Sequence, residues 1–237
     1  MKKTGQPVIY KNLANLVSLL GVLPICLLFG EHGYQYLLPL IIYNNFMDDL
    51  DGVLAAMLNI RSDFGARLDN VCDAIPHTVF VMFVGMHFAE EAGHAYLDGI
   101  FLASCLLASS AIILRVVNRV NPKSHNGTGS PTNELIRHIF FVLIVTEYFA
   151  FYPVPFLIAV CLFHSISMLV RFKMPFLLRS LTQSVPAIFL VNVALLLAWL
   201  VPSFASVIAA AFFATYLMSF LAYGSGSLKS VDTSSTH

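Results

Sequence analysis

Long runs of apolar residues dominate this sequence and decide which solvent surrounds it. Only 11% of the chain is charged, and the apolar residues form eight stretches, at 12–30, 35–58, 64–89, 97–118, 134–151, 153–172, 181–200 and 203–223. A helix needs about 20 apolar residues to cross a membrane. Because a backbone in lipid must satisfy its own hydrogen bonds, these runs indicate helices rather than barrel strands. The predicted fold class is all-α: a polytopic helical membrane protein with about eight transmembrane helices.

The distribution of charge predicts the orientation of these helices. With eight crossings, all 13 Lys and Arg residues fall at or near one set of helix ends, which the positive-inside rule places in the cytoplasm. The opposite loops carry Glu31, His32, Glu90, Glu91, His94 and Asp98, with no Lys or Arg among them. We therefore expect both termini to be cytoplasmic and the protein to be multi-pass, in a bacterial inner membrane.

The domain organisation is expected to be simple. The loops are too short to hold a second domain, so a single transmembrane domain is predicted for residues 1–223. Gly, Ser and Thr predominate after it, and this composition predicts a disordered cytoplasmic tail over residues 224–237.

Six aspartates gather in a part of the chain that otherwise resembles membrane helix: Asp48, Asp49, Asp51, Asp63, Asp69 and Asp73. An acid at mid-bilayer costs roughly 2.5–3.5 kcal/mol, so such a group needs a compensating charge. Asp48 and Asp51 are three residues apart and Asp69 and Asp73 four apart, so each pair occupies one helix face. Between them, residues 58–65 predict a tight cytoplasmic turn. The two helices would present four carboxylates just below the cytoplasmic surface.

Two residues of this turn carry local predictions. Ser62 is expected to cap the helix that follows, because its hydroxyl can accept a bond from an otherwise unpaired amide. Gly65 is expected to let another group approach the backbone closely, because glycine has no side chain.

Four carboxylates at close quarters repel one another unless cations share them. All-oxygen ligation selects hard divalent ions such as Mg²⁺, Mn²⁺ or Ca²⁺. One or two such ions can neutralise phosphate charge and align an in-line displacement. The pattern therefore predicts a phosphoryl-type transfer.

The same residues resemble the signature of the CDP-alcohol phosphotransferase (CDP-alcohol phosphatidyltransferase) family. The match covers every fixed position but one, in the segment Asp48-x-x-Asp51-Gly52-x-x-Ala55-Ala56-x8-Gly65-x3-Asp69-x3-Asp73. The resemblance implies two Mg²⁺ or Mn²⁺ ions per site, held by the four aspartates of the signature, with Asp73 also the general base. It implies CDP-lipid binding around Gly52, Ala55 and Gly65.

One position departs from the family pattern. Where the family has Arg directly after the conserved Ala, this chain has Ala56. Arg61 and Arg67 lie near the same turn and are the candidate substitutes for the missing charge.

The acceptor is suggested by residues outside the signature. Arg115-x-x-Asn118 and the segment 127–131, which includes Ser130, resemble features of the phosphatidylserine synthase branch, as does Asn12-x-x-Asn15-x-x-Ser18. Against this, Pro76-His77-Thr78 stands where that branch has Ser-Phe-Gly. The resemblance implies transfer of a phosphatidyl group from CDP-diacylglycerol to serine with release of CMP, and Arg115, Asn118 and Ser130 as acceptor or phosphate contacts.

Other readings stay open. Glycerol 3-phosphate, inositol, inositol phosphate and choline are alternative acceptors for the same chemistry. A cation-coupled transporter is an alternative class, because intramembrane acids mark ion paths, although transport predicts internal repeats that are not visible here. A catalytically silent lipid- or nucleotide-binding relative is motivated by Ala56. The expected partners are the two substrates, the lipid bilayer and a second copy in a homodimer, with no nucleic acid.

Overall fold

The computed structural model describes residues 8–92, 95–120, 131–169 and 185–234, and these residues form helices without a strand. The long helices are α2 (Leu13–Val22), α3 (Leu37–Met57), α4 (Asp63–Ala92), α5 (Ala95–Val120), α6 (Pro131–Tyr148), α7 (Val154–Leu169), α9 (Val185–Leu200) and α10 (Ala205–Ser234). The short ones are α1 (Val8–Lys11) and the 3₁₀ helices η1 (Leu23–Phe29), η2 (Gly33–Tyr36) and η3 (Pro202–Phe204). The all-α prediction is confirmed for this part of the chain.

Apolar surface covers the outside of these helices. Three segments are long and apolar enough to cross a membrane by length and composition: Asp63–Ala89, Tyr96–Asn118 and Pro202–Leu221. Only 28–44% of the residues in their most apolar windows are buried inside the protein. Shorter apolar helices lie at Leu13–Phe29, Val154–Leu169 and Ile188–Leu200. The helices indicate a membrane protein, whereas the count of eight crossings and the orientation stay predictions.

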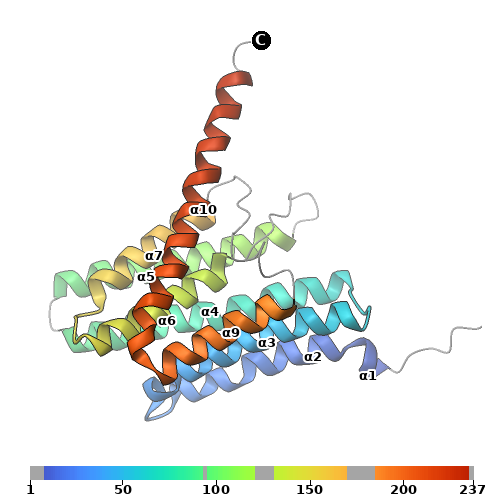
Figure 1. Ribbon diagram of the computed structural model, residues 1–237. Coiled ribbons are helices and arrows are strands. Elements are labelled where there is room, and N and C mark those ends of the chain that lie inside the picture. The colour runs from blue at the N-terminus through green and yellow to red at the C-terminus, as the bar shows by residue number, and fades with distance from the viewer. Residues whose placement is uncertain (1–7, 93–94, 121–130, 170–184, 235–237) are drawn as a thin grey trace, which may run out of the picture.

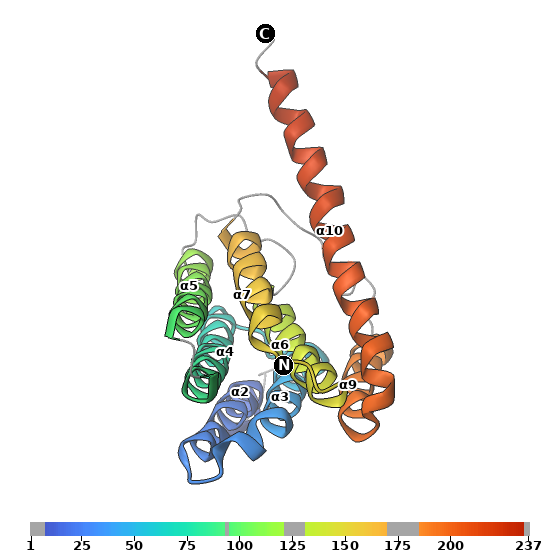
Figure 2. The ribbon, with the colours of Figure 1, turned by 90° about the vertical axis from the view of Figure 1, so that its left-hand side faces the viewer.

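The helices pack as a bundle from which one helix projects. Helix α2 packs against α3 and α4, α4 against α5, α5 against α7, α6 against α7 and α10, and α3 against α9. Helices α2 to α9 lie side by side in Figure 1, and α10 rises steeply beyond them, as Figure 2 also shows. Phe80, Phe101, Phe140 and Phe141 are fully buried in the core. Because lipid is as apolar as these side chains, close packing rather than exclusion of water holds such helices together.

The turn between α3 and α4 positions the acidic residues. Asn59 takes a left-handed conformation (φ 52°), and the amides of Asn59 and Ile60 bond back to the carbonyls of Ala56 (3.2 Å) and Ala55 (3.1 Å). This is a Schellman motif, which ends a helix and reverses the chain. Helix α4 then starts with Ser62 as its cap, because the Gly65 amide donates to Ser62 Oγ at 3.0 Å. The capping prediction is confirmed.

The side chain of Asn15 on α2 comes close to the backbone at Gly65. A Cβ at this position would lie 2.9 Å from Asn15 Oδ1 and 3.1 Å from Ser62 Oγ. The close neighbour expected from the sequence is therefore α2 of the same chain.

The C-terminal region differs from the sequence-based prediction. The composition predicts a disordered tail from Gly224, but α10 continues to Ser234. A formed helix extends by one hydrogen bond per residue without a new nucleation step. Gly and Ser reduce helix stability by only about 0.5–1 kcal/mol each, so their presence does not by itself end the helix.

Candidate metal and acceptor site

Three of the four predicted metal ligands meet at one point. One carboxylate oxygen from each of Asp48, Asp51 and Asp69 lies within 4.8 Å of the other two. Helix α3 supplies Asp48 and Asp51, and α4 supplies Asp69. Asp51 is buried, with 5% of its surface exposed, and the other two are partly buried. We call these three residues the carboxylate cluster.

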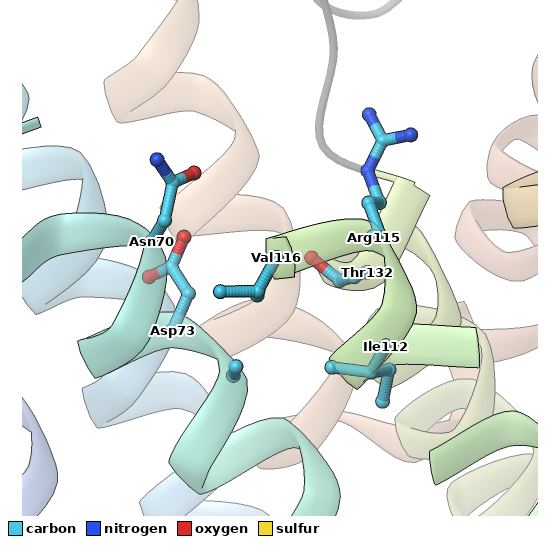
Figure 3. A pocket seen from close by; sticks show the side chains of 7 residues that line it. Asn70, Asp73, Ile112, Arg115, Val116 and Thr132 are labelled. Atoms are coloured by element: carbon cyan, nitrogen blue, oxygen red, sulfur yellow. The ribbon is translucent and has the colours of Figure 1, made fainter. Parts of the chain in front are cut away.

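Asp73 lies beside the carboxylate cluster and faces a second feature. Its carboxyl group lies close to that of Asp48. It also lines a small cavity between α4, α5 and α6, together with Asn70, Ala74, Ile112, Arg115, Val116 and Thr132. Asp73 and Arg115 lie on opposite sides of this space (Figure 3). We call it the acceptor cavity because Arg115, one of the acceptor contacts predicted from the sequence, lines it. Asp73 therefore belongs to both the acidic group and the acceptor cavity.

Helices α2 and α6 each send one hydrogen-bond donor to the carboxylate cluster. The hydroxyl of Ser18 donates to Asp51 Oδ2, and Asn133 Nδ2 donates to Asp48 Oδ2 at 2.5 Å. The sequence offered only a weak signal for either donor: Ser18 closes the motif that begins at Asn12, and Asn133 is a polar residue near the start of a helix.

Asp49 is outside the carboxylate cluster although it adjoins Asp48. Its Oδ2 accepts hydrogen bonds from Asn192 Nδ2 on α9 (2.7 Å) and from Asn45 Nδ2 (3.2 Å). Successive residues of a helix point about 100° apart, so Asp49 faces another neighbour than Asp48 does.

Arg137 has a different place from the one that the charge distribution indicates. The positive-inside pattern groups it with bases at helix ends, but only 9% of its surface is exposed. Its Nε donates to Asn45 Oδ1 at 2.8 Å, and a terminal nitrogen pairs with Glu134 at 2.7 Å. A buried ion without partners is strongly unfavourable, so these two contacts explain why the bundle tolerates Arg137.

The remaining predicted residues are more dispersed. Gly52 is exposed on α3, and a Cβ there would meet no atom within 4 Å. Ala55 is partly buried, whereas Ala56, Arg61 and Arg67 are exposed near the turn. Asn118 is exposed and does not line the acceptor cavity, unlike Arg115. Ser130 lies outside the described residues.

The carboxylate cluster fits a hard divalent cation. Such ions take oxygen ligands at about 2.0–2.6 Å, so the ligand atoms of one ion lie at most about 5 Å apart. The three carboxylate oxygens meet this limit. Carboxylate oxygens are also the donor type that Mg²⁺ and Mn²⁺ prefer.

Comparison with known families places this site in context. The family model of CDP-alcohol phosphatidyltransferases matches residues 11–223. Neither the search of curated proteins nor the search of solved structures gave a match. The matched region contains both acidic helices and the acceptor cavity. The match is to the family as a whole, so membership of the phosphatidylserine synthase branch stays a prediction. The chain belongs to the CDP-alcohol phosphatidyltransferase family, which transfers substituted phosphate groups from CDP-alcohols in phospholipid synthesis.

Proposed function

We propose that this protein transfers a phosphatidyl group from CDP-diacylglycerol to the hydroxyl of serine and releases CMP. The lining of the acceptor cavity carries this proposal, because Asp73 lines it on one side and Arg115 on the other. Serine has a hydroxyl that can contact Asp73 and a carboxylate that can contact Arg115. Arginine is suited to bind a carboxylate through two parallel hydrogen bonds. Choline and inositol have no anionic group for Arg115.

Each side chain of the site has its own role in the proposed reaction. Mg²⁺ or Mn²⁺, two ions per site, would be held by Asp48, Asp51, Asp69 and Asp73 and would neutralise the charge of the diphosphate. Asp73 accepts the proton of the serine hydroxyl while the serine oxygen bonds to the phosphatidyl phosphorus. The bond from that phosphorus to the CMP oxygen breaks, and CMP leaves with the electron pair. Arg115 orients the acceptor for this in-line attack.

The CDP-lipid side of the site is assigned to the exposed end of α3. Gly52 and Ala55 leave room for the nucleotide, and Arg61 in the neighbouring turn and Arg67 near the start of α4 are the candidates for the charge that Ala56 lacks. The basic residues near this end support its location on the cytoplasmic side of a bacterial inner membrane. The lipid substrate would then enter sideways from the inner leaflet of a multi-pass protein, and the acceptor from the cytoplasm. A homodimer is expected from the family.

The direct test uses purified, detergent-solubilised full-length protein with CDP-diacylglycerol and Mg²⁺ or Mn²⁺. CMP release is followed with serine, glycerol 3-phosphate, inositol, inositol phosphate or choline added singly. Ethanolamine is the matched control, since it is serine without the carboxylate. We expect CMP with serine alone. Arg115→Gln should raise the KM for serine about 10–100-fold, because a hydrogen bond to a charged group contributes roughly 1.5–3 kcal/mol.

Other outcomes would change the assignment. CMP release with a different acceptor would replace serine and keep the reaction. Absence of CMP with every acceptor, despite metal-dependent binding of CDP-diacylglycerol, would favour the silent relative that Ala56 suggests. Cation uptake by proteoliposomes without CMP release would favour the transporter.

Gly52→Ala tests where the nucleotide binds. A Cβ at Gly52 meets nothing within 4 Å, and replacing a helical glycine with alanine stabilises by about 0.5–1 kcal/mol. We therefore expect unchanged or higher thermal stability together with a KM for CDP-diacylglycerol raised about tenfold, an order-of-magnitude effect for a methyl group in a binding pocket. Gly99→Ala on α5 is the control, because a Cβ there also meets nothing within 4 Å. Equal KM values in the two variants would place the nucleotide elsewhere.

A further inference from the structure

The first turn of α6 reaches the acidic face of α3. Asn133 donates from Nδ2 to Asp48 Oδ2 at 2.5 Å, across 85 residues of sequence. Its neighbour Thr132 lines the acceptor cavity. One helical turn therefore contacts both the proposed acceptor site and a member of the carboxylate cluster.

A second contact fixes the position of this turn. One turn further along α6, Arg137 Nε donates to Asn45 Oδ1 at 2.8 Å. Asn45 precedes Asp48 by three residues, so the contacts Asn133–Asp48 and Arg137–Asn45 form successive rungs between antiparallel helices. Glu134 pairs with Arg137 at 2.7 Å, and both side chains are buried. The distance between α6 and Asp48 is thereby set by more than one bond.

The chemical nature of Asn133 suits it to this place. A carboxylate has two oxygens, so one can accept a hydrogen bond while the other remains available to a cation. An uncharged amide orients the carboxylate and leaves its negative charge in place. A lysine or arginine would neutralise that charge. Partners that orient metal-binding groups typically contribute 10–100-fold to metal affinity or activity.

We propose that Asn133 is a positioning residue that orients the Asp48 carboxylate for a divalent cation, with the Arg137–Asn45 contact holding α6 in place. This inference rests on the proposed function, in which the carboxylate cluster binds Mg²⁺ or Mn²⁺. It adds to the site a residue outside the signature segment 48–73.

The test measures Mn²⁺ affinity of the metal-free, full-length protein in detergent by electron paramagnetic resonance, without substrates. Asn133→Ala should weaken Mn²⁺ binding about 10–100-fold. Asn133→Leu, which keeps the branching and the number of non-hydrogen side-chain atoms but removes the donor, should weaken it to the same extent. An unchanged Mn²⁺ affinity in both variants would overturn the proposal.

Asn192→Ala is the matched control. It deletes an amide that donates at 2.7 Å to Asp49, the adjacent carboxylate outside the carboxylate cluster. We expect a loss of thermal stability similar to that of Asn133→Ala, with Mn²⁺ affinity unchanged. An equal loss of Mn²⁺ affinity in Asn192→Ala would show that Asn133 acts only through general packing and would contradict the proposal.

A double-mutant cycle tests whether Asn133 acts through Asp48. In an Asp48→Ala background, Asn133→Ala should cause little further loss of thermal stability in the metal-free protein, because residues that share one interaction are not additive. Full additivity would contradict the assignment. Absence of Mn²⁺ binding by the unmodified protein would contradict the proposed function as well as this inference. Normal Mn²⁺ binding with the same affinity in the Asn133 variants would contradict this inference alone.

Discussion

Asp73→Asn is expected to lower kcat for CMP release by about 10²–10⁴-fold, the range that a general base contributes. The amide has nearly the same shape as the carboxylate but cannot accept the proton of the acceptor hydroxyl. Asp73 lines the acceptor cavity, whereas the carboxylate cluster consists of Asp48, Asp51 and Asp69. At least one Mn²⁺ per chain should therefore still bind, as measured by electron paramagnetic resonance.

Asp63→Asn provides the matched control for this variant. Asp63 begins the same helix but is exposed and lies outside the carboxylate cluster. Its substitution should leave kcat within a few-fold of the original value. If Asp73→Asn retained normal kcat, another group would be the base, and the role assigned to the acceptor cavity would be wrong.

Asp51→Asn is expected to remove Mn²⁺ binding and activity while raising the melting temperature of the metal-free protein. Two unit charges about 5 Å apart repel by roughly 3 kcal/mol at an effective dielectric constant of 20, and Asp51 is the most buried member of the carboxylate cluster. The amide keeps an oxygen that can accept from Ser18 but carries no charge. A gain of about 1 kcal/mol would raise the melting temperature by about 2–4 °C.

The response to metal distinguishes this effect from a general change in packing. Added Mn²⁺ should stabilise the original protein, because a ligand that binds only the folded state shifts the unfolding equilibrium, and should not stabilise Asp51→Asn. Asp49→Asn is the control, since Asp49 accepts from Asn192 and Asn45 rather than belonging to the carboxylate cluster. Lower metal-free stability in Asp51→Asn, with Mn²⁺ stabilisation retained, would contradict a metal role for the carboxylate cluster.

Local patterns predicted much of the fold around the acids. The apolar runs indicated helices because lipid offers the backbone no hydrogen-bond partners. The spacing of Asp48 and Asp51 placed them on one helix face, because the helical period is a local property. Ser62 was predicted as a cap for the same reason, since its bond to the Gly65 amide spans three residues.

Local sequence patterns could not predict the hydrogen-bond donors around the site. Asn133–Asp48 and Asn192–Asp49 join residues 85 and 143 positions apart. Contacts of this kind depend on how helices pack, and helix periodicity contains no information on which neighbour a polar face meets. The same reason explains Arg137, whose sequence neighbourhood indicates a surface base but whose partners, Asn45 and Glu134, bury it.

The sequence by itself therefore predicted the helical class, the acidic residues of the candidate site and the turn that brings α3 and α4 together, because each depends on periods and caps within a few residues. The tertiary structure alone decided that Asp73 shares a cavity with Arg115, that α2 and α6 supply hydrogen bonds to the acids, and that Asp49 faces α9. These features arise from contacts between helices distant in sequence, where side-chain packing sets the geometry.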